Sequence, residues 1–263
     1  MKYFLILVLC INSIAYSMEL KLGVEPIINP SLMKKELVPL IAFANEHIPT
    51  RYVASYSFAE VVRQIQSGEI NTIYASSSYF YLLKKLGFVP VLKSRQTLHQ
   101  VMIHNPDESH QAFNRLYYVK NDLSSMFRMR GFDPLKIKPV PTMTSEVAIF
   151  AVLKDARTQA LIMEDELGLL SDVMKNKIMV TDRRPIGVVY LMAHQSIAQS
   201  LVDWWIELER FHQTFKDPDG KYNYLNIYQF DRFNGEDAFW KGRLDEYNTF
   251  IQPLLEEVLT VTP

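Results

Sequence analysis

Runs of hydroxyl side chains follow several short apolar segments of this sequence, each where a strand would give way to a helix. The clearest run is Ser76–Ser78, which follows the apolar segment Ile70–Ala75 and precedes an aromatic and aliphatic stretch. Such a turn leaves backbone N–H groups and serine hydroxyls free at a helix N-terminus, a place that favours a small polar or anionic group. A simple helix cap accounts for one hydroxyl at a junction, but accounts less well for three.

Hydroxyl groups recur at three further junctions of the same kind. They are Ser57, the pair Ser124 and Ser125, and the segment Thr142–Ser145. In open α/β sheets such junctions lie at the carboxyl ends of the strands, where ligands bind. Several helix N-termini that converge on one point hold an anion without lysine or arginine. The repeated pattern therefore predicts a binding site for a small polar or anionic ligand.

Two acidic residues occupy comparable positions. Glu25 and Glu164 each follow a predicted strand, so both carboxylates are candidates to face the same cleft and to pair with a cationic group of the ligand. The alternative is that they are solvated loop carboxylates. As a glycosidase pair they lack any supporting signature.

Other chemistry finds little support in the sequence. The six histidines show no H-x-x-x-H or H-x-H spacing, so no metal site is expected, and G-x-S-x-G, P-loop and G-x-G-x-x-G motifs are absent. Cys10 is the only cysteine, which excludes disulfides and a thiol nucleophile once the N-terminus is removed. We expect no cofactor and no catalysis; a hydrolase built from dispersed residues is a remote alternative.

The N-terminus is typical of an exported chain. Residues 1–17 combine the basic Lys2, an apolar core from Phe4 to Ile11, and small residues at Ala15 and Ser17. This predicts a cleavable signal peptide and a periplasmic location. Without Lys2 the mature chain carries 27 basic and 29 acidic residues, and the basic ones are scattered. No nucleic-acid surface is therefore expected.

The elements that must position these residues form two α/β units. Strands are predicted at 20–24, 51–54, 70–75, 88–92, 116–119, 138–140 and 159–163, with return strands at 178–180 and 187–194. Helices are predicted at about 30–47, 57–68, 78–87, 145–154, 197–212 and 236–259, with a short one after Ser125. The alternation predicts largely parallel sheets. Since no flexible linker separates the units, a cleft between two lobes is the natural ligand site.

Segments spread from about Leu20 to Arg210 resemble the periplasmic phosphonate-binding family, the solute-binding components of ABC transporters. LKLGVEPIINP is similar to the opening strand and turn of that family, and YSFAEVVRQIQSGEINTIYASSSYFYLL to its next helix, strand and ligand-binding turn. TSEVAIFAVLKDARTQALIMEDE is similar to the helix, strand and acidic turn of its second lobe. The resemblance implies a type 2 periplasmic binding protein fold, an α/β architecture of two lobes. Its ligand-binding positions fall here on Tyr74, Ser76, Ser77, Ser124, Ser125, Thr144, Ser145 and Glu164. Ile27 stands where the family commonly has an aromatic residue, and the loop NDLSSMF is shorter than the family's phosphonate-binding loop.

These observations together predict a monomeric, exported solute-binding protein. Its first lobe comprises 18–100 and 188–263, and its second lobe 101–187. The cleft between them would capture a small polar or anionic ligand, phosphonate-like in kind, for the permease of an ABC transporter. A periplasmic sensor that signals to a membrane receptor is the alternative.

Overall fold

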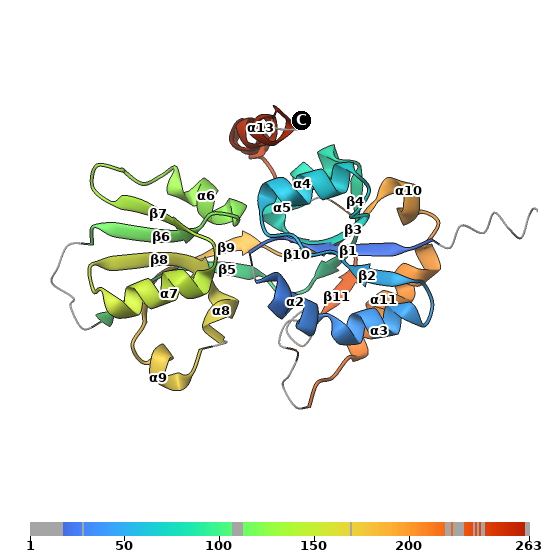
Figure 1. Cartoon of the computed structure of the whole chain (residues 1–263), viewed down its shortest axis with the longest axis horizontal. Helices are drawn as coiled ribbons and strands as arrows, with labels where there is room; N and C mark the ends of the chain where they lie inside the picture. The colour runs from blue at the N-terminus through green and yellow to red at the C-terminus, as the bar shows by residue number, and fades with distance from the viewer. Residues whose placement is uncertain are drawn as a thin grey trace, which may run out of the picture.

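The computed structural model describes residues 18–260 except 28, 107–112, 169, 219–221, 223–228, 234, 236, 238 and 239. The expected signal peptide, 1–17, lies outside the described residues. Within the described part, the strands form two separate sheets, one in each of two lobes that lie side by side (Figure 1). The sequence prediction of an α/β chain with two lobes is confirmed.

The first lobe is built on a six-stranded sheet in the order β11-β4-β10-β3-β1-β2. Its strands are β1 (Leu20–Val24), β2 (Thr50–Tyr52), β3 (Thr72–Ser76), β4 (Phe88–Ser94), β10 (Val189–His194) and β11 (Phe230–Arg232). The strand β1 runs parallel to β2 and β3, whereas β10 runs antiparallel to β3 and β4. The largely parallel sheet that the sequence predicted is therefore mixed, because β10 enters this sheet from the other lobe.

Helices cover both faces of this sheet, and the apolar residues of each helix form the core between the layers. On one side lie α2 (Pro30–Glu36), α3 (Val38–Asn45), α10 (Gln195–Ala198) and α11 (Val202–Thr214); on the other lie α4 (Phe58–Gln66) and α5 (Ser77–Lys85). The predicted single helix at 30–47 is interrupted at Leu37, since Pro39 supplies no N–H for the helical hydrogen bond to Lys35. The predicted helix at 197–212 is likewise divided, at Leu201.

The second lobe is built on a five-stranded sheet in the order β7-β6-β8-β5-β9. Its strands are β5 (Leu98–His104), β6 (Arg115–Val119), β7 (Lys138–Thr142), β8 (Thr158–Met163) and β9 (Met179–Gly187). Its helices are α6 (Leu123–Met129), α7 (Ser145–Lys154), α8 (Glu164–Gly168) and α9 (Asp172–Lys175). Here β6 is parallel to β7 and β8, and β5 is antiparallel to β8 and β9.

The chain crosses between the two sheets at two short connections. One joins Ser94 of β4 to Leu98 of β5, and the other joins Gly187 of β9 to Val189 of β10. The first crossing therefore precedes Leu98, whereas the sequence analysis expected it after residue 100. Gly187 has a φ of 106°, in the region that favours glycine, so this residue allows the turn between the sheets.

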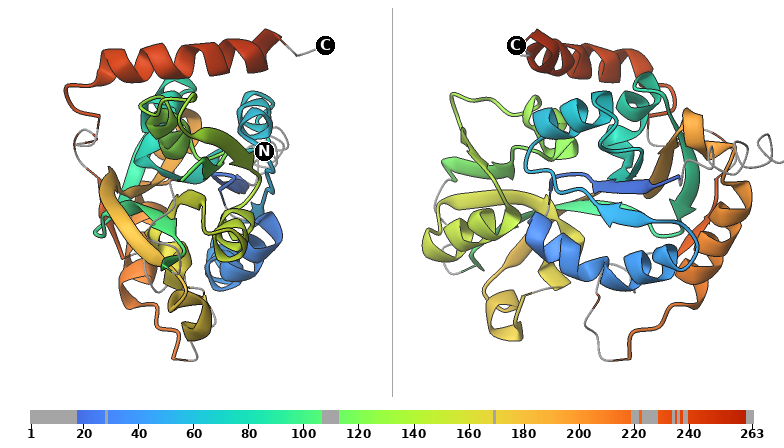
Figure 2. Two further views of the ribbon diagram at one scale, coloured as in Figure 1. Left: turned by 90° about the vertical axis from the view of Figure 1, so that its left-hand side faces the viewer. Right: turned by 45° about the vertical axis from the view of Figure 1, so that its right-hand side comes forward.

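The C-terminal helix α13 (Leu244–Thr260) lies against both lobes (Figure 2). It begins eight residues after the predicted start at 236, a residue outside the described part. Its Phe250 packs against Phe127 of the second lobe, with 5.4 Å between ring centroids, and its Tyr247 lies in the apolar core beneath α4 and α5. Trp240, just before the helix, also packs against Phe127, at 5.0 Å. The C-terminal segment thus bridges the lobes.

Candidate ligand cleft between the lobes

The carboxyl ends of β1 and β3 lie side by side, because the two strands are parallel neighbours. Glu25 follows β1 and is held there by its backbone N–H, which donates to the carbonyl of Tyr74 at 3.0 Å. Its carboxyl oxygen Oε2 accepts hydrogen bonds from the backbone N–H of Ser76 at 3.0 Å and from the Ser76 hydroxyl at 2.8 Å. The N-terminus of α5 is therefore occupied by a side chain of the same protein.

The other two serines of this run also have protein partners. The Ser77 hydroxyl donates to Asp237 at 2.6 Å and accepts from the backbone N–H of Val188 at 2.9 Å, while the Ser77 N–H donates to the Val188 carbonyl. The Ser78 hydroxyl lies 2.6 Å from that of Ser76. The free donors that the sequence analysis expected at this junction are thus occupied. Asp237 belongs to the C-terminal segment, beyond the part of the chain that carried the resemblance.

In the second lobe, a carboxyl group lies at the start of α6, as Glu25 does at the start of α5. Asp122 is the N-cap of α6, and its Oδ1 accepts from the backbone N–H of Ser124 at 2.9 Å and from the Ser124 hydroxyl at 2.6 Å. Its Oδ2 accepts from the Ser125 hydroxyl, which also accepts from Gln100 at 2.7 Å. Burial raises the pKa of Asp122 above its usual value. Ser124 and Ser125 are buried at the start of α6, where their hydroxyls bind this internal carboxyl.

The acidic turn Glu164–Glu166 follows β8, and its two glutamates differ in exposure. Glu164 is partly exposed and pairs with Arg183 at 2.8 Å and with His99 at 3.7 Å. Glu166 is buried, and its Oε2 accepts from the backbone N–H of Met163 at 3.2 Å. Its Oε1 has no hydrogen-bond partner among the described residues. The sequence analysis chose Glu164, but Asp165 and Glu166 are the members of this turn that line the cleft.

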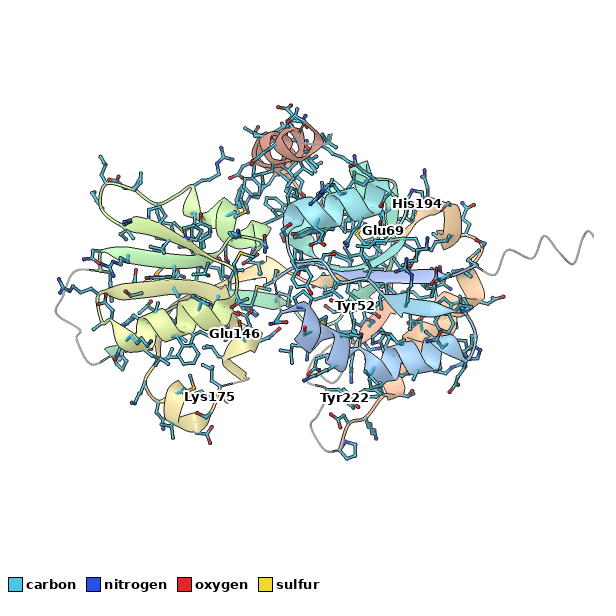
Figure 3. The ribbon with its side chains drawn as sticks, viewed as in Figure 1. Tyr52, Glu69, Glu146, Lys175, His194 and Tyr222 are labelled. Atoms are coloured by element: carbon cyan, nitrogen blue, oxygen red, sulfur yellow. The ribbon has the colours of Figure 1, made fainter. Side chains whose placement is uncertain are left out.

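Burial raises the pKa of Glu166 to about 8, opposed by the hydroxyl of Ser145 and reinforced by the charges of Asp122 and Glu146. Glu146, in the first turn of α7, lies on the second lobe near the boundary between the lobes (Figure 3). Ser145 is buried at the start of α7, and Thr144 is the N-cap, with no side-chain hydrogen bond of the capping type. These two hydroxyl residues are thus placed beside the acidic turn.

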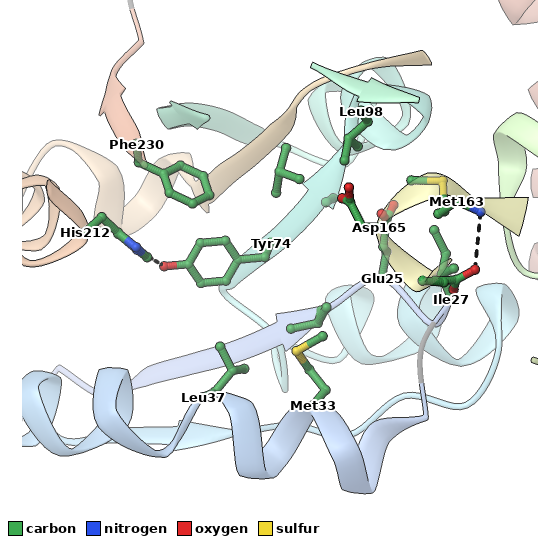
Figure 4. Close-up of a pocket in the computed structure, with 14 residues that line it drawn as sticks. Glu25, Ile27, Met33, Leu37, Tyr74, Leu98, Met163, Asp165, His212 and Phe230 are labelled. Atoms are coloured by element: carbon green, nitrogen blue, oxygen red, sulfur yellow. Dashed lines mark hydrogen bonds between the residues drawn. The ribbon is translucent and has the colours of Figure 1, made fainter. Parts of the chain in front are cut away.

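A cavity of about 80 Å³ lies where β1, β3 and the turn after β8 meet (Figure 4). Its walls are largely apolar, and its described lining residues are Val24, Glu25, Ile27, Met33, Leu37, Tyr74, Ala75, Leu98, Met163, Asp165, Glu166, Val189, His212 and Phe230. Glu25, Asp165 and Glu166 are its acidic residues. Tyr74 points away from them, and its hydroxyl lies 2.6 Å from Nε2 of His212 (Figure 4).

Burial favours the neutral form of three groups that line this cavity, Glu25, Glu166 and His212. Burial raises the pKa of Glu25 to about 8; the two hydrogen bonds from Ser76 oppose this shift, and the charge of Asp122 adds to it. Burial also lowers the pKa of His212 to about 3. At neutral pH, Glu25 and Glu166 are therefore mainly protonated and His212 is uncharged. A positive group that entered the cavity would favour the ionised form of both carboxyls.

Of the predicted ligand-binding residues, Glu25 and Tyr74 line this cavity directly. Ser76 reaches it only through Glu25, and the remaining predicted residues line no part of it. Sequence reasoning missed Glu166, His212 and Phe230. The signal for Glu166 was present in the E-D-E turn, whereas His212 and Phe230 lie in and beyond a helix whose spacing suggests core packing alone.

Two further classes of site are not formed in the described part of the chain. No group of three or more histidine, cysteine, aspartate and glutamate side chains there is arranged to hold a metal ion. None of the helices in that part is both long and apolar enough to cross a bilayer.

No protein-family model and no curated protein sequence matches the chain. Solved structures do match its fold. A binding-protein component of an ABC phosphonate transporter from Pseudomonas aeruginosa has a TM-score of 0.69 at 10% identity, over 92% of this chain and 89% of that one. PhnD1 from Prochlorococcus marinus, in complex with methylphosphonate, has a TM-score of 0.69 at 10% identity, over 89% and 98%. XAC2383 from Xanthomonas citri has a TM-score of 0.65 at 13% identity, over 91% and 99%. The chain therefore has the type 2 periplasmic binding protein fold that the resemblance implied.

Proposed function

We propose that this protein is an exported solute-binding protein that captures a small ligand with a positively charged amino group between its two lobes. The observation that carries this proposal is the pair Glu25 and Glu166, two carboxyl groups from opposite lobes that line one apolar cavity. Each carries a raised pKa, so each can exchange its proton for a cationic partner. Lobe closure on the ligand would bring both groups against it.

The size and lining of the cavity define the class of ligand. A cavity of about 80 Å³ accommodates roughly three water molecules at ~30 Å³ each, and therefore a ligand of only a few non-hydrogen atoms. The side chains opposite the carboxyls, among them Met33, Leu37 and Phe230, are apolar. A short alkylamine satisfies both ends, with its ammonium at the carboxyls and its chain on the apolar wall.

A phosphonate is a poorer match for this cleft, although the neighbour from Prochlorococcus marinus is in complex with one. The donors at the starts of α5 and α6 are already bound to Glu25 and Asp122. An anion at either position would have to compete with the carboxyl for these donors, and it would lie beside a group of like charge whenever that carboxyl is ionised. We therefore propose that the phosphonate-like ligand suggested by the resemblance is replaced here by an amine.

We propose binding without catalysis. No serine, threonine or cysteine is among the described residues that line this cavity. Burial raises the pKa of Tyr74 and lowers that of His212, which makes the tyrosine a poor nucleophile and the histidine a weak base.

The test compares matched ligands by thermal shift and calorimetry. Propylamine and butylamine should stabilise the protein, whereas propylphosphonate should not. Ligand at one hundred times its dissociation constant stabilises by about 2.7 kcal/mol, and so raises Tm by roughly 5–10 °C. Binding at pH 7 should release protons, seen as a dependence of the measured heat on the ionisation enthalpy of the buffer. Stabilisation by the phosphonate and not by the amines would contradict the proposal.

The expected partner is the permease of an ABC transporter. Crosslinking of the loaded protein in membranes, followed by purification, should recover that permease. Recovery of a signalling receptor alone would instead support a sensory role.

A further inference from the structure

A second cavity, of about 540 Å³, lies between α6, the end of β9 and the C-terminal segment. Its described lining residues are Gln100, Ser124, Phe127, Arg128, Arg130, Gly131, Arg184, Pro185, Ile186, Trp240, Arg243, Glu246 and Thr249. None of them lines the cavity between Glu25 and Glu166. Its volume falls within the range of small-molecule sites.

The charge of this cavity is strongly positive. Four arginines line it, from α6, the residue after it, β9 and the C-terminal segment, whereas Glu246 is the only acidic residue among its described lining residues. Glu246 is bound to Arg243 at 2.9 Å. Arg128 and Arg184 share a single carboxylate, that of Asp182. Two guanidinium groups thus share one carboxylate, so Arg128, Arg184 and Asp182 together carry a net charge of +1.

Arg128 is the most deeply placed of the four. Its side chain is only 10% exposed, and its Nη1 donates to Gln100 at 3.2 Å. Its Nε is buried and has no hydrogen-bond partner among the described residues. The guanidinium of Arg128 is held in place by Gln100 and Asp182 at the wall of the cavity.

One wall of the cavity is aromatic. The rings of Phe127 and Trp240 meet edge to face at 5.0 Å, and the guanidinium of Arg243 lies over both, at 5.2 Å and 5.3 Å from their centroids. This wall offers an apolar surface for the organic part of a ligand, next to the arginines that would hold its charged part.

We propose that this cavity is a second ligand site, specific for a small organic phosphate. The guanidinium groups of Arg128, Arg130 and Arg184 hold the phosphate, for which the planar fork of arginine is the best match among protein cations. Phe127 and Trp240 contact the organic part. Since the walls come from the second lobe and from the C-terminal segment, the bound phosphate also fastens that segment to the lobe.

The first experiment measures binding to the full mature chain by calorimetry, with inorganic phosphate, phenyl phosphate and AMP as probes. Phenyl phosphate and AMP should bind saturably and more tightly than inorganic phosphate, and all three should weaken between 50 and 200 mM salt, roughly the range over which surface charges become screened. Absence of saturable binding by all three at millimolar concentration would overturn the proposal.

The second experiment removes the charge at exposed positions, where the fold is not at risk. Arg130→Ala with Arg184→Ala should raise the Kd for phenyl phosphate by at least about tenfold. The control, Arg63→Ala with Arg115→Ala, removes the same net charge from exposed arginines outside the cavity and should leave the Kd within about twofold of wild type. An equal loss in both double variants would show a net-charge effect only and would overturn the site.

A third variant adds a charge and deletes no arginine. Thr249→Glu, on the exposed face of α13, places a carboxylate at the cavity wall, and Gln252→Glu places one a turn further along the same helix. Only Thr249→Glu should weaken phenyl phosphate binding. Neither should affect amine binding at Glu25 and Glu166, which separates failure of this proposal from failure of the interlobe site.

Discussion

Replacing Glu166 by glutamine should remove a large part of the pH dependence of this protein's stability. The side chain is buried, and its carboxyl has an ordinary pKa of 4.5 when unfolded and about 8 when folded. Glutamine has nearly the shape of the protonated carboxyl and keeps the acceptor for the Met163 N–H. Near pH 5, where the carboxyl is protonated in the folded state, the change should therefore cost little.

The magnitude follows from the two pKa values. Between pH 4.5 and 8 the folded protein holds a proton on Glu166 that the unfolded chain has released. Stability contributed by this group is therefore full below pH 4.5 and falls as the pH rises, by about 1.4 kcal/mol per unit at most. From pH 5 to 7 the wild type should lose about 2.5 kcal/mol that Glu166→Gln does not lose.

The assay is urea unfolding of both proteins without ligand, at pH 5, 6 and 7. His212 has the opposite dependence, since its folded pKa is lowered to about 3 and its contribution is lost as the pH falls below 6.5. The difference between variant and wild type cancels this contribution. Glu164→Gln is the matched control, because it changes a partly exposed carboxylate two residues away; its effect should stay below about 1 kcal/mol.

One result would refute the reasoning. If the difference in unfolding free energy between Glu166→Gln and wild type is the same at pH 5 and pH 7, Glu166 does not change its proton occupancy on folding. The protonated cavity, and with it the predicted release of protons on amine binding, would then be wrong.

Three further predictions concern neighbouring groups. Tyr74→Phe should destabilise the protein by about 1–3 kcal/mol in urea unfolding, because Nε2 of the buried His212 loses its partner. Trp240→Ala should cost about 3–5 kcal/mol and accelerate amide exchange in α13, since this fully buried ring joins the C-terminal segment to both lobes. Ser76→Ala removes a hydrogen bond that lowers the pKa of Glu25, so amine affinity should rise with pH over a higher range than in wild type; an unchanged pH profile would contradict this.

The fold followed from the sequence wherever local pattern and burial agree. The helix at 145–154 was predicted with the bounds that the structure has, and the predicted strand at 159–163 differs from β8 by one residue at its start. The local sequence pattern did not predict strand bounds where these depend on pairing with a strand distant in the sequence. The return strand predicted at 178–180 is the start of the nine-residue β9, which is largely exposed and gains its order from pairing with β5.

The site was harder to predict than the fold, because it depends on which group meets which across the chain. Glu25 was found from its position after β1 and Tyr74 from the resemblance, and both line the cavity. The partners of the serines were not found. Asp237 lies 160 residues from Ser77 in the sequence, and no local pattern indicates that pairing.

The serine runs have the geometry of an anion-binding site, but carboxyl side chains of the same chain occupy the position of the bound anion. Glu25 binds at the start of α5 and Asp122 at the start of α6, in the places where helix dipole and N–H donors favour negative charge. Yet burial raises the pKa of both carboxyls, so desolvation outweighs those donors. Since Glu25 and Glu166 are buried and mainly protonated at neutral pH, the cleft favours a cation over another anion. The four arginines that line the second cavity outnumber the two carboxylates paired with them, Asp182 and Glu246. We therefore propose an amine for the cleft and a phosphate for the second cavity, whereas the family resemblance had suggested a phosphonate for the cleft.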